Sequence, residues 1–296
     1  DIPAQELRAK YANAESEFVD LGDGLTVHLR DEGPKDAPAL ILLHGSNASL
    51  HTWQQWVDRL GKDYRIIRYD QPGHGLTGPH PKDDYSAAGF VDVVDRVAKN
   101  RGLTKFYVGG NSMGGWVTHE YAKAHPEKLQ GIILVDAGGA PDSQPKSLPV
   151  GFRIARMPVL NQLARIITPR SMVEKSLRQS VSNAAVATPT EVDEYWELLR
   201  HPGNREATGK RFALYSSRNT QTAVSDATRK VPALILWGDE DKLIPVDAAK
   251  WFQSTYTGNV THIYKGIGHM PMEESADKSA EDVRNWLKVR TSAPAD

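Results

Sequence analysis

The chain has 296 residues, and its apolar share of 40% and charged share of 25% are ordinary for a globular protein with a sizeable core. The formal net charge of −1 favours neither a nucleic acid nor an anionic membrane as a partner. The chain contains no cysteine, which excludes a thiol nucleophile, disulfide bonds and thiolate metal ligands. It also lacks a run of about 18 apolar residues, so no segment is expected to span a bilayer.

The first part of the chain predicts a hairpin followed by alternating strands and helices. A Gly-Asp-Gly turn at 22–24 separates two strand-like segments, 17–21 and 25–30. The apolar run at 39–44 is typical of a strand that is buried on both faces. The spacing of apolar residues then predicts a helix at 50–60, a strand at 64–69, a helix at 86–99 and a strand at 105–110.

The rest of the chain continues this alternation after a long interruption. Strands are predicted at 129–136, 233–237 and 260–264, and helices at 247–255 and 273–289. Such alternation predicts an α/β fold with a mostly parallel sheet, helices on both of its faces and the hairpin as an antiparallel edge. Segment 140–230 has helical patterns, shows no strong strand and is too long for a loop. We therefore expect a core formed by 1–139 and 231–296, and an inserted helical cap, or lid, at 140–230.

A serine lies at the junction between the predicted strand 105–110 and the helical pattern that follows it. Residues 110–114 read Gly-Asn-Ser-Met-Gly, and a G-x-S-x-G sequence in this position is typical of a nucleophile elbow. Its glycines allow a sharp, strained turn, and the start of the helix stabilises negative charge. Ser112 is therefore a candidate nucleophile, and the alternative is an ordinary helix N-cap serine.

A histidine and several acids follow in the order that this kind of site requires, which is nucleophile, acid, base. His269 lies in a glycine-flanked loop after the last predicted strand, which makes it the candidate base; the alternative is a surface histidine. Three acids crowd the loop after the strand at 233–237, and a fourth ends the strand at 129–136. The candidates for the acid that orients the base are therefore Asp239, Glu240, Asp241 and Asp136.

An acyl-transfer site also needs hydrogen-bond donors for the oxyanion. Backbone N–H groups do this in elbow-type sites: one from the residue after the nucleophile and one from the loop after an earlier core strand. The candidates are the N–H groups of Met113 and of Ser46, which follows the apolar run at 39–44. The glycine before Ser46 lets this loop approach a substrate closely.

Five ordered motifs carry a resemblance to the α/β-hydrolase superfamily. They are His44-Gly45, Asp-Gln-Pro-Gly-His-Gly at 70–75, Gly-Asn-Ser-Met-Gly-Gly at 110–115, Trp-Gly-Asp-Glu-Asp at 237–241 and Gly268-His269. The resemblance covers almost the whole chain outside the expected cap and implies the α/β-hydrolase fold. It also implies Asp241 as the orienting acid, because the family places that acid at the end of Gly-x-x-Asp.

The elbow sequence resembles three groups within this superfamily: carboxylesterases, monoacylglycerol-lipase-like enzymes, and carbon–carbon hydrolases that cleave ring-fission products. The last group usually has a glycine-rich oxyanion loop and a tryptophan after the catalytic histidine, whereas this chain has Gly-Ser-Asn-Ala-Ser at 45–49 and Met270. Haloalkane dehalogenases and epoxide hydrolases of this fold use an aspartate at the elbow, and Ser112 argues against them.

These observations predict a serine hydrolase that cleaves a small-molecule carboxylic ester without a cofactor or a metal. Its expected catalytic residues are Ser112, Asp241 and His269, with the N–H groups of Ser46 and Met113 as the oxyanion hole. The first alternative is a carbon–carbon bond hydrolase of ring-fission diketo acids with the same triad. The second is a ligand-sensing protein of this fold with little turnover.

The start of the chain bears on localisation. Asp1 is not an initiator methionine, and segment 2–13 resembles that of bacterial relatives with an apolar N-terminal anchor. We expect a periplasmic or membrane-anchored bacterial enzyme if a leader or anchor has been removed, and a cytoplasmic one otherwise. The sequence carries no signal for acyl or alcohol specificity, stereoselectivity or oligomeric state.

Overall fold

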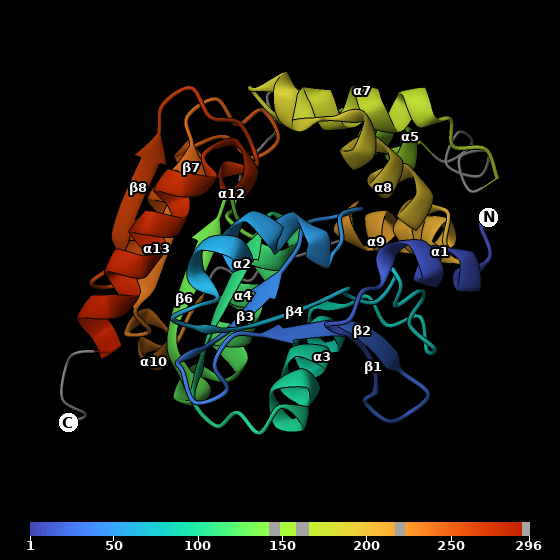
Figure 1. Ribbon diagram of the computed structural model, residues 1–296. Coiled ribbons are helices and arrows are strands. Elements are labelled where there is room, and N and C mark those ends of the chain that lie inside the picture. Colours follow the sequence, from blue (N-terminus) through green and yellow to red (C-terminus); the bar gives the residue numbers. More distant parts are fainter. Residues whose placement is uncertain (142–148, 158–165, 217–222, 292–296) are drawn as a thin grey trace.

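One eight-stranded sheet forms the centre of the protein, in the strand order β1-β2-β4-β3-β5-β6-β7-β8 (Figure 1). The computed structural model describes residues 1–141, 149–157, 166–216 and 223–291. β2 pairs antiparallel with β1 and β4, and the other strands pair in parallel, which confirms the predicted mostly parallel sheet with an antiparallel edge. From β1 to β8 the strands span Ser16–Asp20, Thr26–Glu32, Ala39–Leu43, Arg65–Tyr69, Phe106–Asn111, Leu129–Val135, Ala233–Gly238 and Val260–Tyr264.

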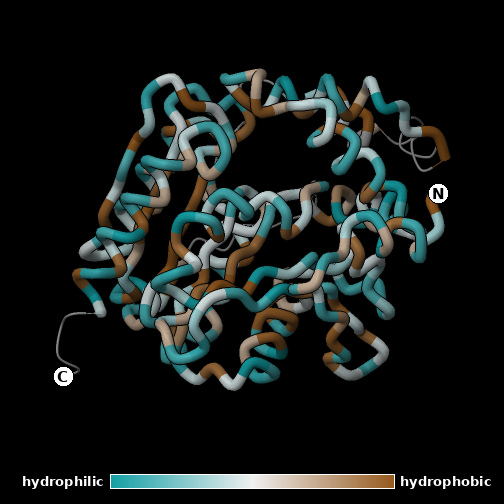
Figure 2. The backbone as a smooth tube through the Cα atoms, viewed as in Figure 1, coloured by the Kyte–Doolittle hydropathy of each residue, from teal (hydrophilic) through white to brown (hydrophobic). Residues whose placement is uncertain are grey.

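The inner strands are apolar on both sides because helices cover both faces of the sheet. Every residue of β3, β5 and β7 is buried. One apolar cluster joins one face to α3 (Ala87–Asn100), α4 (Met113–Ala124) and α11 (Asp247–Thr255). A second cluster joins the opposite face to α2 (Gln54–Leu60) and α13 (Ala276–Thr291). In Figure 2 hydrophobic residues run along the central strands, and the outer turns of many helices are hydrophilic.

Three helical segments differ from the prediction. The pattern at 50–60 forms a 3-10 turn, Leu50–Trp53, before α2 begins, and Ala4–Tyr11 forms a helix, α1, that was not predicted. The prediction of a single helix at 273–289 is wrong, because the helix is interrupted at Ser275, between α12 (Pro271–Glu274) and α13. Ser275 has φ −137° and ψ 50°, outside the helical region. The short α12 thereby brings its Glu274 carboxylate back to the loop that precedes it.

The chain between β6 and β7 folds mainly into helices, and its described residues contain no strand. Figure 1 shows most of these helices grouped at one end of the sheet, apart from the helices that cover its faces. Among the described residues no helix is long and apolar enough to cross a membrane. The helices of this inserted segment are α5 (Val150–Arg156), α7 (Arg170–Ser180), α8 (Pro189–Leu199), α9 (Asn204–Ser216) and α10 (Asp226–Arg229).

Candidate active site

Ser112 occupies a strained turn between β5 and α4. Its φ of 55° and ψ of −114° lie in a region that residues with a Cβ rarely adopt. The flanking glycines make the turn possible: a Cβ on Gly110 would lie 2.2 Å from the Gly114 backbone, and one on Gly114 would lie 2.1 Å from the Leu43 carbonyl oxygen. The residue sequence thus folds here as the strand–turn–helix that the G-x-S-x-G pattern predicts.

His269 and Asp241 form a buried hydrogen-bonded pair. The distance from His269 Nδ1 to Asp241 Oδ2 is 2.7 Å, and the two residues are only 5% and 1% exposed. The other carboxylate oxygen, Oδ1, accepts the backbone N–H groups of Leu243 (2.8 Å) and Ile244 (3.1 Å). A carboxylate at Nδ1 places the proton there, so Nε2 carries the lone pair. Nε2 is buried and has no hydrogen-bond partner among the described residues.

The other acids named by the sequence do not bind this imidazole. Asp239 accepts the backbone N–H of Gly266 at 2.7 Å, and Glu240 accepts the Ser182 hydroxyl at 3.0 Å. Both therefore bind other loops. Of the four candidate acids, Asp241 is the one that the structure places on His269 Nδ1.

Asp136 lies next to this pair and is also completely buried. Polar atoms of Asp136, Asp241 and His269 come within 4.8 Å of one another, close enough for a cation site. However, burial and the adjacent Asp241 charge raise the pKa of Asp136 well above its usual range, which favours a neutral carboxylic acid. The Gly238 N–H donates to one Asp136 oxygen at 3.1 Å, and the neutral carboxyl group can donate its proton to the adjacent Asp241 carboxylate.

The His269 loop is held by contacts that the sequence did not reveal. The Glu274 carboxylate accepts four backbone N–H groups: two in this loop, from Gly268 (3.2 Å) and Met270 (3.3 Å), and two in the inserted segment, from Ser182 (2.8 Å) and Asn183 (3.0 Å). In the sequence Glu274 resembles any acid in the first turn of a helix. Only its distant partners distinguish it, and no local pattern indicates them.

Two further contacts fix the same loop. The His269 N–H donates to the Ser180 carbonyl oxygen at 3.0 Å, which joins the loop to the end of α7. The Asn111 side chain donates to the carbonyl oxygens of His269 (3.0 Å) and Val135 (3.1 Å). Asn111 precedes Ser112 in the elbow motif, so the motif itself was the signal that could have identified it.

The predicted oxyanion residues also come together beside the elbow. Met113 is the first residue of α4, so its N–H has no acceptor within the helix. The Ser46 hydroxyl lies 3.4 Å from Met113 Sδ. A Cβ on Gly45 would lie 3.2 Å from Ser112 Cβ, which shows how closely the Ser46 loop approaches the serine. Neither N–H donates to another group among the described residues.

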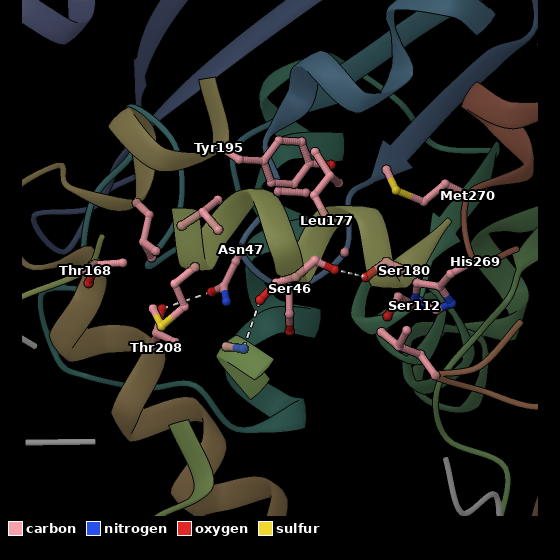
Figure 3. A pocket seen from close by; sticks show the side chains of 18 of the residues that line it. Ser46, Asn47, Ser112, Thr168, Leu177, Ser180, Tyr195, Thr208, His269 and Met270 are labelled. Atoms are coloured by element: carbon pink, nitrogen blue, oxygen red, sulfur yellow. Dashed lines mark hydrogen bonds between the residues drawn. The ribbon is translucent and has the colours of Figure 1, made fainter. Parts of the chain in front are cut away.

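Ser112, His269 and Ser46 line one pocket that extends under the inserted segment (Figure 3). Figure 3 places Ser112 and His269 at the same end of it. The pocket has an empty volume of about 1040 Å³, part of which is open to solvent. The exposed surface of the pocket is largely apolar, with Ile154, Met172, Leu177, Leu199, Leu243 and Met270 in its lining. Thr168, Arg205 and Thr208 also line it, and Figure 3 places Thr168 and Thr208 at the end away from Ser112. The arrangement can hold an apolar group beside a serine hydroxyl and an imidazole nitrogen.

Comparison with known proteins agrees with this fold. The chain is 25% identical over 304 residues to a 2-hydroxy-6-oxononadienedioate/2-hydroxy-6-oxononatrienedioate hydrolase of Burkholderia vietnamiensis, covering 97% of this chain and 98% of the relative. It is 25% identical over 258 residues to a monoacylglycerol lipase of Xenopus laevis, covering 86% and 76%. The crystal structure of a membrane phospholipase A, a bacterial virulence factor, superposes with a TM-score of 0.81 at 21% identity, covering 98% and 93%.

A family profile described as the alpha/beta hydrolase fold matches residues 38–276, which is most of the chain and includes every residue of the candidate site. The profile, the mostly parallel sheet and the similar solved structure all agree with the fold and superfamily expected from the sequence motifs. This protein therefore belongs to the α/β-hydrolase family.

Proposed function

We propose that this α/β-hydrolase cleaves carboxylic esters through an acyl-enzyme intermediate, with Ser112, His269 and Asp241 as its catalytic triad. One observation carries the proposal. The 2.7 Å contact from His269 to Asp241 leaves an unpartnered Nε2 in the pocket that Ser112 also lines. That is the state in which an imidazole accepts a proton from a serine.

The first half of the reaction forms the acyl-enzyme. His269 Nε2 takes the proton from the Ser112 hydroxyl while Oγ attacks the ester carbonyl carbon. Asp241 holds the imidazole in the required tautomer and stabilises the imidazolium that forms. The tetrahedral intermediate then collapses: the carbon–oxygen bond to the alcohol breaks, and the imidazolium gives its proton to the leaving oxygen. In the second half, water attacks the acyl-enzyme by the same route and frees Ser112.

The negative charge of the intermediate needs donors at fixed positions. We assign this role to the backbone N–H groups of Ser46 and Met113, which have no other acceptor among the described residues. The N-terminal end of α4 adds its positive dipole at the same point. A single donor of this kind lowers the barrier by about 3 kcal/mol in enzymes of comparable chemistry.

The inserted segment 140–230 is assigned the role of a cap that forms the acyl site. Its helices α7 and α8 supply Met172, Leu177 and Leu199 to the pocket wall. Such a lining favours a hydrocarbon chain over a polar acyl group, because burying apolar surface contributes about 25 cal/mol per Å². The proposed substrates are therefore esters with an apolar acyl chain.

A carbon–carbon bond hydrolase is the second candidate, favoured by the relative from Burkholderia vietnamiensis, which matches 97% of this chain. Against it stand the Gly-Ser-Asn-Ala-Ser oxyanion loop, Met270 after the histidine and the largely apolar surface of the pocket. Both reactions would use the same triad, so the substrate decides between them. Turnover of a vinylogous diketo acid far above that of simple esters would replace the ester assignment.

A series of p-nitrophenyl esters with increasing acyl length tests the proposal. We expect kcat/KM to rise from acetate to a medium-length chain, as the apolar pocket fills. The Ser112→Ala variant should lose this turnover and remain folded. Equal rates for wild type and Ser112→Ala, or no hydrolysis of any ester in the series, would refute the function proposed.

A further inference from the structure

Arg211 is a buried cation that lies between the inserted segment and the oxyanion loop. It belongs to α9 and is only 1% exposed. Burying a guanidinium is costly unless its N–H groups find acceptors. Its Nη1 lies 3.3 Å from Ser46 Oγ and 3.5 Å from Met113 Sδ, and its Nη2 lies 3.0 Å from Asn47 Oδ1. One side chain from the inserted segment thus contacts both loops of the proposed oxyanion hole.

The partners of Arg211 make this arrangement specific. Ser46 and Met113 are the residues whose N–H groups we assign to the oxyanion, and their side chains also contact each other at 3.4 Å. Asn47 has φ 61°, a left-handed conformation that surrounding contacts must maintain. Thr208, one turn before Arg211, supports the same residue: Thr208 Oγ1 lies 3.0 Å from Asn47 Oδ1, a contact drawn in Figure 3.

We propose that Arg211 is a positioning residue that holds the Ser46 and Met113 N–H groups in the oxyanion-binding geometry. Catalysis then depends on the position of α9 relative to the loops that carry these two residues. This inference rests on the ester hydrolase function proposed above. The guanidinium acts through the loops rather than by touching the substrate, since it lies on the side chains of the donor residues. A displacement of about 1 Å at such donors reduces the rate by about 100-fold.

The shape of the guanidinium is as important as its charge. Its planar fork presents several N–H groups in fixed directions, whereas an ammonium is a compact point charge on a flexible stem. Only the fork can contact Ser46, Met113 and Asn47 at once. Lysine at this position is therefore expected to keep the charge and lose the placement of the loops.

The first test compares Arg211→Met and Arg211→Lys with wild type in steady-state ester hydrolysis. We expect both variants to lose at least about tenfold in kcat with KM changed less than about threefold, because the oxyanion forms after the substrate binds. Affinity for a trifluoromethyl ketone, which forms a tetrahedral adduct with an oxyanion, should fall in proportion to kcat/KM. Lys210→Ala is the matched control: its side chain lies on the same helix in exposed ion pairs with Asp83 and Glu206, and wild-type kinetics are expected.

A second variant tests the same link if Arg211→Met unfolds. Ser46→Ala keeps the backbone N–H and removes only the hydroxyl that Arg211 contacts. Ser46→Ala should lower kcat several-fold. In a double variant that combines it with Arg211→Met, or with Arg211→Lys, the two losses in kcat should not multiply, because both substitutions act through one contact. Full multiplication of the losses would show that Arg211 does not act through Ser46.

The outcomes separate this inference from the function on which it rests. If wild type hydrolyses esters, and Arg211→Met and Arg211→Lys match Lys210→Ala in kcat and in ketone affinity, the positioning role is overturned. The same holds if the variants lower only the melting temperature. If wild type itself hydrolyses no ester, the function falls, whatever the variants do.

Discussion

The carboxyl groups of Asp136 and Asp241 lie side by side in the interior, yet only Asp241 hydrogen-bonds His269, with 2.7 Å between Oδ2 and Nδ1. Asp136 directly follows β6 and Asp241 lies in the loop after the neighbouring parallel strand β7, which explains their proximity. Two buried carboxylates with oxygens within 4.8 Å of each other repel, and one of them is expected to keep its proton. The pKa of Asp136 is the one raised, by burial first and by the Asp241 charge second.

This difference predicts that two similar substitutions affect activity to very different extents. Asp241→Asn removes the charge that holds the His269 tautomer, and kcat should fall by about 10⁴-fold, as in triads where the acid is changed to its amide. Asp136→Asn replaces a neutral acid by a neutral amide of the same shape and should keep kcat within a few-fold. Steady-state ester hydrolysis by the two purified variants checks this. A larger loss of kcat from Asp136→Asn than from Asp241→Asn would make Asp136 the functional acid.

The same pair predicts a pH dependence of stability. A raised pKa means that folded Asp136 keeps its proton at pH values where the unfolded chain has lost it. The folded state then binds more protons, so the free energy of unfolding falls as pH rises from about 4 toward the raised pKa. Each pH unit in this window costs at most about 1.4 kcal/mol. Asp136→Asn removes this dependence.

Urea unfolding of wild type and Asp136→Asn between pH 4 and pH 8 measures this effect. The variant should gain stability relative to wild type as pH rises. Parallel curves for the two proteins would show that Asp136 is ionised in the folded state.

The strained Ser112 backbone predicts that function is gained here at the expense of stability. Ser112 has φ 55°, and glycine adopts such angles without the clash of a Cβ. Ser112→Gly should therefore be more stable than Ser112→Ala by about 1 kcal/mol, although both remove the hydroxyl. Urea unfolding of both variants at one pH gives the comparison. Equal or reversed stabilities would mean that the turn carries no strain that glycine relieves.

Glu274 predicts a link between the histidine loop and the inserted segment. Its carboxylate accepts backbone N–H groups from both, and removing it leaves four donors without this partner. Glu274→Ala should lower the free energy of unfolding by about 2 kcal/mol and reduce kcat, because His269 loses its support. Glu281→Ala is the control: this exposed acid, paired only loosely with Lys278, should change stability by less than about 0.5 kcal/mol.

Thermal and urea unfolding, together with ester kinetics, distinguish the two roles of Glu274. Loss of stability with an unchanged kcat would limit Glu274 to a structural function. No change in either quantity would remove it from the account of the site.

The sequence predicted what local patterns determine. β3 and β7 are continuous apolar runs because both of their faces are buried, and the turn at Ser112 follows from its flanking glycines. The choice between Asp136 and Asp241 could not be made locally. Both follow buried strands, and only the packing of the His269 loop against the ends of β6 and β7 decides which one meets the imidazole.

Long-range contacts account for what the sequence did not predict. Ser182 and Glu274 are 92 residues apart, so nothing near Glu274 indicates that its carboxylate binds the inserted segment, or that the predicted helix is interrupted at Ser275. Arg211 looks like a solvated arginine on a helix until its contacts with the Ser46 loop are known. α1 carries one buried residue, Leu7, which is too weak a pattern to predict a helix.

The most direct test of the central claim is mass spectrometry after reaction with a fluorophosphonate probe, which labels an activated serine. We predict one adduct, located at Ser112, and its absence from the Ser112→Ala variant. His269→Ala, which removes the base, should slow labelling strongly while Ser112 is still present. A label on another residue, or none under conditions where wild type hydrolyses esters, would contradict the assignment of Ser112 as the nucleophile.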